Sequence, residues 1–232
     1  MGDVIVVQFS TVDGVVSDPD GRSGTAYGGW AFRYGPGPVT EDKFRLGVRM
    51  ERGVQLYGRR TWERFARLWP GRDGDFARLM NAVPKRVATR TGIDPTVWSN
   101  SAAIEGDPLA WVKEETSRRD VVVIGSLSLV HALAAADLVD EYRLITFPTV
   151  VGAGDRLFAT GVPAEFRFTL VDAVDAAALT VLRRHRGDES GEDRGDESGQ
   201  EGADREPAAV RTATSAAGGP RTAIGRLGAG AH

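Results

Sequence analysis

Apolar positions along the chain alternate between short unbroken runs and longer stretches with helical spacing. The unbroken runs are typical of strands buried on both faces, as in Val-Ile-Val-Val-Gln-Phe at residues 4–9. Such runs predict strands at residues 4–9, 54–57, 84–90, 97–98, 120–126, 141–148, 166–170 and 179–184. The intervening stretches predict helices at residues 41–52, 59–69, 76–82, from 108 onward and at 126–136.

Strands that alternate with helices indicate an α/β domain with a mixed, mostly parallel central sheet flanked by helices. The last two predicted strands have no helix between them, which predicts an antiparallel edge at the C-terminal side of the sheet. We expect this domain to span residues 1–186. Residues 187–232 contain no aromatic side chain and few large apolar ones, so they are predicted to form a disordered, low-complexity tail.

The composition is that of a globular protein, with 41% hydrophobic and 26% charged residues. Nine acidic residues and five arginines give residues 187–232 a net charge of −4, against −3 for the whole chain. The predicted domain is therefore nearly neutral, which argues against a nucleic-acid partner held by a broad basic face.

Several other classes of protein and site are excluded or disfavoured. The chain has no cysteine, which rules out disulfides and thiolate chemistry, and its three histidines are too widely separated to favour a metal site. No apolar run is long enough to span a membrane, and the N-terminus lacks a signal-peptide pattern. We therefore expect a cytoplasmic protein with a small-molecule ligand and no metal.

Three predicted strands end in groups that suit phosphate. Two of them turn on a glycine into a helix, and helix N-termini at one edge of a parallel sheet offer free backbone N–H groups to anions. The third ends at an arginine that could meet a 2′-phosphate, so the three ends predict a dinucleotide site that prefers NADPH to NADH. Ordinary strand–helix junctions with solvated arginines are the alternative. The residues concerned are Gly58, Arg59, Arg60, Thr61, Thr89, Arg90, Gly125, Ser126, Leu127 and Ser128.

Several motifs, in this order, resemble the dihydrofolate reductase-like family. Leu-Tyr-Gly-Arg-Arg-Thr-Trp-Glu at 56–63 resembles its Gly-Arg-x-Thr-Trp-Glu segment, and Val-Val-Ile-Gly-Ser at 122–126 resembles its Val-Ile-Gly-Gly turn. Pro-Lys at 84–85, Leu-Val-Asp-Glu at 138–141 and Pro-x-x-x-Gly-x-Gly at 148–154 are closer to the C-terminal reductase domain of the riboflavin-biosynthesis protein RibD and its stand-alone relatives. The resemblance runs from Val4 to about Arg184.

This resemblance implies a dihydrofolate reductase-like fold, NADPH as cofactor and a homodimer. Asp42 falls where dihydrofolate reductase keeps its acidic residue, which makes it the candidate proton donor, although RibD-like relatives do not generally keep that acid. Carboxylates are also common in the first turn of a helix. The resemblance also implies a role for other residues by position. The cofactor phosphates would be bound by Gly58, Arg59, Arg60 and Thr61, the adenosine ribose and 2′-phosphate by Thr89 and Arg90, and the pyrophosphate and nicotinamide ribose by Ile124, Gly125, Ser126, Leu127 and Ser128. The nicotinamide would be contacted by the backbone of Phe9 and Val16, and the substrate by Trp30 and Thr146.

The predicted function is NADPH-dependent hydride transfer to a small C=O or C=N substrate, such as a pteridine or pyrimidine. One alternative is the 5-amino-6-(5-phosphoribosylamino)uracil reductase of riboflavin biosynthesis. That enzyme would need a basic cluster for the substrate phosphate, for which Arg33, Arg45 and Arg49 are candidates. A second alternative, from another class, is a non-catalytic nucleotide-binding module whose tail recruits partners.

Overall fold

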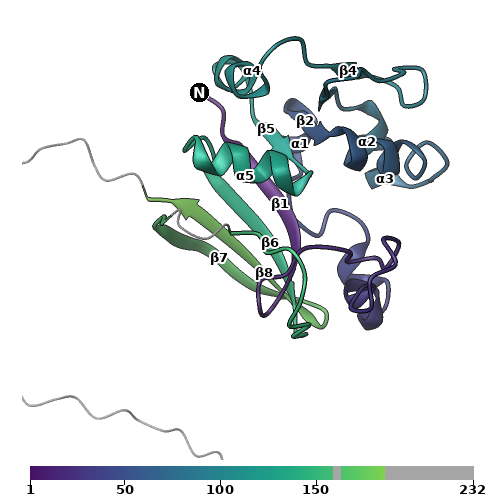
Figure 1. Cartoon of the computed structure of the whole chain (residues 1–232), viewed down its shortest axis with the longest axis vertical. Helices are drawn as coiled ribbons and strands as arrows, with labels where there is room; N and C mark the ends of the chain where they lie inside the picture. Colours follow the sequence, from purple (N-terminus) through teal and green to yellow (C-terminus); the bar gives the residue numbers. More distant parts are fainter. Residues whose placement is uncertain (159–162, 186–232) are drawn as a thin grey trace, which may run out of the picture. The chain divides into compact units, whose positions relative to one another are not determined.

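The computed structural model describes residues 1–158 and 163–185, and its central feature is an eight-stranded sheet (Figure 1). The predicted tail lies outside the described residues. The strands are β1 (Val4–Thr11), β2 (Val54–Gly58), β3 (Lys85–Ala88), β4 (Ser101–Ala103), β5 (Val121–Val123), β6 (Glu141–Phe147), β7 (Phe166–Val174) and β8 (Ala177–Arg184). They lie side by side in the order β4-β3-β2-β5-β1-β6-β8-β7.

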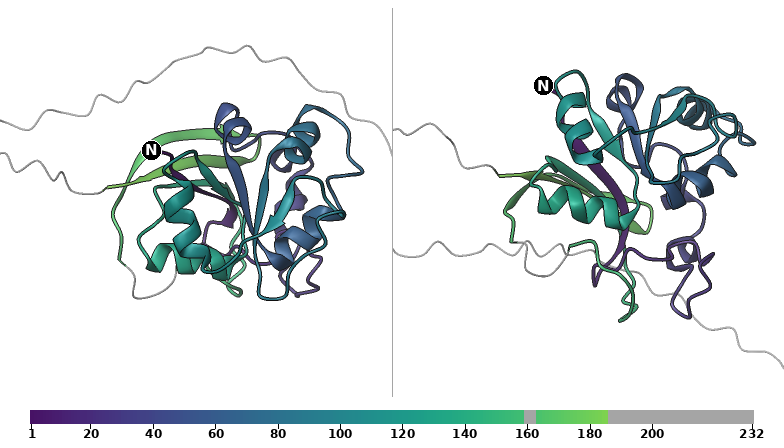
Figure 2. Two further views of the ribbon diagram at one scale, coloured as in Figure 1. Left: turned by 90° about the horizontal axis from the view of Figure 1, so that it is seen from above. Right: turned by 45° about the horizontal axis from the view of Figure 1, so that its top comes forward.

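Helices cover both faces of the sheet (Figure 2). The α-helices are α1 (Val48–Arg52), α2 (Arg59–Ala66), α3 (Asp75–Ala82), α4 (Pro108–Glu115) and α5 (Leu127–Ala135), and two 3-10 helices, η1 (Trp30–Tyr34) and η2 (Gly37–Val39), follow β1. Side chains of α1, α2 and α3 pack together against one face, while those of α4 and α5 pack against the other. No helix among the described residues is long and apolar enough to span a bilayer.

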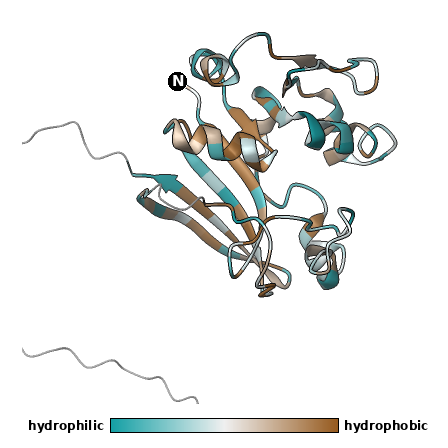
Figure 3. Ribbon diagram, in the orientation of Figure 1, coloured by the Kyte–Doolittle hydropathy of each residue, from teal (hydrophilic) through white to brown (hydrophobic). Residues whose placement is uncertain are grey.

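Alternation along β1 divides its side chains between two cores. Ile5 and Val7 pack in the cluster that contains Met50 of α1 and Trp62 of α2, whereas Val6 packs with α4 and α5. All three residues of β5 are fully buried, in agreement with their unbroken apolar sequence. The apolar strands at the centre of the sheet stand out in Figure 3.

The predicted mixed sheet with an antiparallel C-terminal edge is confirmed. The strands from β4 to β6 run parallel, whereas β8 is antiparallel to both β6 and β7. The strand predicted at residues 97–98 is wrong, because Trp98 lies in a turn and is buried by packing, with its Nε1 donating to Asn81 Oδ1 at 2.6 Å. The strand begins only after Asn100, whose φ of 61° ends that turn.

The helix predicted from Glu41 is also wrong in extent, because only α1 is helical. Glu41 and Arg45 have φ values of 59° and 51°, and left-handed residues interrupt a right-handed helix. The carboxylate of Asp42 accepts the N–H groups of Leu46 at 2.9 Å and Gly47 at 2.7 Å. This side chain therefore closes a turn that competes with helical backbone bonding.

Candidate functional site

The strands β1 and β5 diverge at their carboxyl ends, and we call this part of the sheet edge the crevice. The β1–β5 ladder ends where Val6 pairs with Val123, whereas the β1–β6 ladder continues until Thr11 pairs with Phe147. Residues 7–11 therefore have a strand partner on one side only. The chain leaves β1 across one face toward β2 and leaves β5 across the other toward β6. Ligands of open α/β sheets bind at such a divergence.

Two glycine turns meet beside this crevice. The N–H of Gly58 donates to the carbonyl of Gly125 at 2.7 Å, and a β-carbon on Gly58 would overlap Ser126 Oγ. Gly125 has a φ of +112°, and a β-carbon there would lie 3.3 Å from Thr61 Oγ1. The Gly125–Ser126 peptide bond is cis. The close approach of the turns therefore requires glycine at 58, and the positive φ favours glycine at 125.

The helices that follow these turns begin without a side-chain cap. Gly58 and Ser126 are the N-cap residues of α2 and α5, and neither helix receives a capping hydrogen bond from a side chain. The Ser126 hydroxyl contacts the Ser128 hydroxyl at 2.9 Å, and Leu127 between them is half-buried. Uncapped first-turn N–H groups and hydroxyls form an electropositive donor set, which suits phosphate oxygens.

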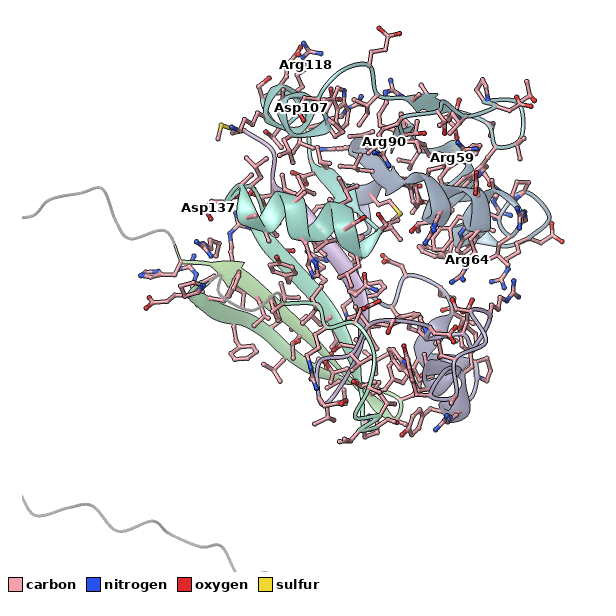
Figure 4. The ribbon with its side chains drawn as sticks, in the orientation of Figure 1. Arg59, Arg64, Arg90, Asp107, Arg118 and Asp137 are labelled. Carbon is pink, nitrogen blue, oxygen red and sulfur yellow. The ribbon has the colours of Figure 1, made fainter. Side chains whose placement is uncertain are left out.

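Arginines border the same edge. Because Gly58 pairs with Ala88, the turn that starts at Thr89 lies beside the start of α2. Arg59 donates to Glu63 at 2.7 Å and contacts the Thr91 hydroxyl, which joins it to the turn that carries Arg90; both arginines are labelled in Figure 4. The guanidinium groups of Arg60 and Arg90 are exposed, and neither makes a hydrogen bond or ion pair with the described residues. Both are available to a ligand.

The loop after β1 is held by the segment that follows β6. Asp13 accepts the N–H of Gly152 at 2.9 Å, and the N–H of Val16 donates to the carbonyl of Asp155 at 2.9 Å. Ser17 Oγ accepts the N–H of Asp155 at 2.9 Å. Several long-range bonds therefore fix the conformation of this loop.

Sequence reasoning missed this anchor. Gly154 has a φ of +118°, and a β-carbon there would lie 2.6 Å from Ser17 Oγ. The spacing of Gly152 and Gly154 was the available signal, but it does not show which loop they contact. Such a contact depends on two segments far apart in the sequence.

The two carboxylates of this loop, Asp13 and Asp18, accept hydrogen bonds from neighbouring residues. A hydrogen bond from the Thr11 hydroxyl at 2.6 Å, together with backbone N–H groups, lowers the pKa of Asp13. Burial acts to raise the pKa of Asp18, but hydrogen bonds from Thr25 and Ser23 outweigh it and the pKa is lowered. Both side chains are therefore ionised structural acceptors. Among the residues that the structure describes, no three His, Asp or Glu side chains gather as a metal site.

The structure does not bring the two predicted substrate residues together. Trp30 is fully buried, its Nε1 donates to the carbonyl of Ser17 at 3.1 Å, and its ring packs on Phe147, 5.6 Å away between centroids. Thr146 is the neighbour of Phe147 in β6, so its side chain points to the opposite face of the sheet. Phe9 stacks on Phe44 on the face of Trp30.

Two further predicted residues, Ile124 and Asp42, have structural partners of their own. Ile124 is half-buried, and its N–H donates to the carbonyl of Leu56 at 3.1 Å. The two oxygens of Asp42 both accept the backbone N–H bonds of the turn described above. Asp42 therefore stabilises this turn, and its role as a proton donor stays a prediction.

Solved structures share this fold. A protein from Shewanella sp. PV-4, described as a riboflavin biosynthesis protein, is 19% identical, with a TM-score of 0.61 over 80% of this chain and 100% of that one. A pyrimidine reductase-like protein from Corynebacterium diphtheriae is 9% identical, with a TM-score of 0.56 over 80% of this chain and 93% of that one.

A bifunctional protein shares the fold over part of its length. It is a diaminohydroxyphosphoribosylaminopyrimidine deaminase/5-amino-6-(5-phosphoribosylamino)uracil reductase from Thermotoga maritima, 17% identical with a TM-score of 0.50. The similarity covers 79% of this chain and 57% of the bifunctional one. A comparison with curated proteins gave no match.

The sequence resemblance and the shared fold agree with a match to a family model. The family is described as the RibD C-terminal domain, and its model spans residues 3–180, from the start of β1 into β8. That range includes both glycine turns, the Thr89–Arg90 turn and the anchored loop. The chain therefore belongs to the RibD C-terminal domain family.

Proposed function

We propose that this protein is an NADPH-dependent reductase that transfers a hydride to a small C=O or C=N substrate of pyrimidine or pteridine type. The observation that carries the proposal is the meeting of two uncapped helix N-termini, through Gly58 and Gly125, beside the unpaired edge of β1. Membership of the RibD C-terminal domain family and the reductases among the similar structures support it.

The residues at the crevice fit a phosphorylated dinucleotide. The first-turn N–H groups of α2 and α5 would hold the pyrophosphate, and the unpaired guanidinium groups of Arg60 and Arg90 would meet the 2′-phosphate. The N–H of Val16 already donates to Asp155, so the contact of Val16 with the nicotinamide amide would fall to its carbonyl. The unpaired backbone near Phe9 would supply the other contact.

Once bound, the nicotinamide supplies the hydride, and the protein supplies position and shielding. The anchored loop after β1 excludes water from one side of the crevice, because its bonds to Asp155 and Gly152 hold it in place. A rigid wall would help to keep the reacting carbons in contact and would shield them from water.

The direct test follows the oxidation of NADPH by the full chain with a panel of pyrimidine, pteridine and simple carbonyl substrates. The proposal predicts turnover with at least one cyclic C=O or C=N substrate and loss of that turnover in Gly125→Ala. Tight NADPH binding without turnover on any substrate would favour the non-catalytic nucleotide-binding module.

A role as the 5-amino-6-(5-phosphoribosylamino)uracil reductase is the second candidate, favoured by the name of the similar bifunctional structure from Thermotoga maritima. The basic cluster predicted for its substrate phosphate does not form. Arg49 binds Asp3 and Asp120 at the amino ends of the strands, opposite the crevice, and Arg45 pairs with Asp172. Faster turnover of the phosphorylated substrate than of its dephosphorylated form would support this candidate, and equal rates would contradict it.

A further inference from the structure

An aromatic stack lies on β1 at the crevice. Phe9 belongs to the part of β1 that has no partner on the β5 side, and its ring stacks on that of Phe44, with 5.6 Å between centroids and 21° between planes. The ring of Phe147 in β6 meets Phe9 edge-on at 5.6 Å. Phe147 and its neighbour Trp30 are fully buried, whereas Phe9 and Phe44 are half-buried. The stack therefore runs from the core to a partly exposed ring, that of Phe44.

Phe44 covers β1 between its two neighbouring strands. It packs against the cluster that contains Val122 of β5 and also against the cluster that contains Ile145 of β6. Among the residues that the structure describes, Phe9 is the only aromatic ring that stacks on Phe44. The second face of the ring therefore has no aromatic partner. Flat rings stack on such a face with about 4.5–7 Å between centroids.

Arg143 of β6 holds the backbone at Phe44. Its Nη1 donates to the carbonyls of Phe44 at 2.8 Å and Arg45 at 2.6 Å. Its Nε donates to Glu141 at 2.6 Å, and Glu141 also pairs with Arg183. The Arg143 side chain is only 12% exposed. A buried guanidinium that bonds two successive carbonyls fixes the conformation of that turn.

Asp42 fixes the same turn through its N–H groups. Its carboxylate accepts those of Leu46 and Gly47, while Arg143 holds the carbonyls of the two residues before them. Two charged side chains therefore hold residues 42–47 in one conformation. A ring that is fixed before binding loses little conformational entropy when a ligand stacks on it.

We propose that Phe44 selects a planar nitrogen heterocycle as substrate by stacking on its ring, and that Arg143 is a positioning residue that holds Phe44 in place. This assignment rests on the proposed reductase function and deepens it, because the heterocycle would lie beside the nicotinamide, near the unpaired backbone of Phe9. It gives neither residue a part in hydride or proton transfer. A substrate without a planar ring would gain nothing from Phe44.

The test is calorimetric titration of the full-length chain with pterin and with 5,6-diaminouracil, each without cofactor and with saturating NADP⁺. Phe44→Leu keeps an apolar side chain but removes the aromatic face, so it should weaken binding of both heterocycles about tenfold. Its NADPH affinity should equal that of wild type. Phe44→Tyr keeps the face and should bind the heterocycles like wild type. Phe168→Leu is the matched control, because Phe168 is exposed on the edge strand β7.

Arg143→Lys tests the positioning role. Lysine keeps the charge beside Glu141 but lacks the planar fork that reaches both Glu141 and the two carbonyls. Arg143→Lys should weaken heterocycle binding and leave NADPH affinity unchanged. The double variant Phe44→Leu/Arg143→Lys should bind no more weakly than Phe44→Leu, because both changes remove the same interaction. Additive losses in the double variant would overturn the role of Arg143.

Melting temperatures should show that each variant is folded. Equal heterocycle binding by wild type and Phe44→Leu overturns the assignment, as does a wild type that binds NADPH but neither heterocycle. Both results leave the reductase function standing. Heterocycle binding that depends on Phe44 in a chain that does not bind NADPH would support the stacking site and contradict the proposed cofactor.

Discussion

Gly125 is the residue on which the account of the crevice depends most. Its φ of +112° lies in a region that side-chain-bearing residues rarely adopt, and its neighbour across the turn is the Thr61 hydroxyl. The residue matters for function because the proposed pyrophosphate position lies against the same turn. The effect of backbone strain can be separated from the loss of cofactor binding, because other glycines with a positive φ lie away from the proposed pyrophosphate position.

Gly125→Ala should fold but bind NADPH at least tenfold more weakly than wild type. The matched control is Gly106→Ala, because Gly106 has a φ of +79° and open space around its α-carbon. Both variants should lose about 1 kcal/mol of stability from the unfavourable φ. Calorimetric titration gives the affinities, and equal NADPH affinity in the two variants would place the phosphate elsewhere.

Arg60 and Arg90 should determine the preference for NADPH over NADH. A charge-assisted contact with the 2′-phosphate contributes about 1.5–3 kcal/mol, so the double variant Arg60→Gln/Arg90→Gln should lose about tenfold or more of that preference. NADH affinity should change little. Arg118→Gln serves as the control for surface charge, and an unchanged NADPH/NADH ratio in the double variant would reject both assignments.

At the scale of elements, continuous apolar runs predicted the core strands, since burial on both faces leaves a clear mark on sequence. The helix expected from Glu41 failed because the Asp42 side chain competes for backbone N–H groups, an effect that apolar spacing does not reveal. The opposite orientations of Trp30 and Thr146 also lay beyond prediction, because they follow from strand register. Register depends on the tertiary fold.

Lys85 of β3 joins the end of α3 to the loop before β4 from within the core. Its ammonium group donates to the carbonyls of Asn81 at 2.9 Å, Val83 at 2.7 Å and Ser99 at 3.2 Å, and it lies 4.5 Å from the Trp98 ring centroid. Burial lowers the pKa of Lys85 from 10.5 to about 8. The charge is therefore costly to bury.

This shift predicts a pH dependence of stability. Between pH 8 and 10.5 the unfolded state binds more protons at Lys85 than the folded state does, so stability rises with pH there. The free energy of unfolding of wild type minus that of Lys85→Met should increase by up to about 3 kcal/mol across this range. Urea denaturation measures it. A flat difference would contradict a lowered pKa.

The comparison with Lys85→Met is needed because two buried tyrosines act in the opposite direction. Burial raises the pKa of Tyr57 and raises that of Tyr142 to about 12. Their folded states hold protons that the unfolded state releases, which lowers stability above pH 10. Wild type and Lys85→Met both contain these tyrosines, so the tyrosine contribution cancels in the difference between their free energies of unfolding.

At the scale of the whole molecule, the order of motifs predicted the fold class. It also predicted that the two glycine turns lie at the same edge of the sheet, where Gly58 bonds Gly125. The same order did not show how the loop after β1 is anchored. That anchoring arises when distant segments meet. For the C-terminal residues beyond 186, the composition alone carries a prediction.

Deleting residues 187–232 should leave the melting temperature and NADPH affinity nearly unchanged. The segment carries almost no apolar surface, so its removal exposes little and breaks few stabilising contacts. Differential scanning calorimetry of the shortened and full-length chains measures the effect. A fall of several degrees on truncation would show that the segment packs on the domain.

The central claim is that the crevice between β1 and β5 holds a phosphorylated nicotinamide dinucleotide. Calorimetric titration of the full-length chain with NADPH and then with NADH tests it most directly. The account predicts one NADPH bound per chain, with an affinity about tenfold or more above that for NADH. Absence of NADPH binding, or equal affinity for the two cofactors, would contradict it.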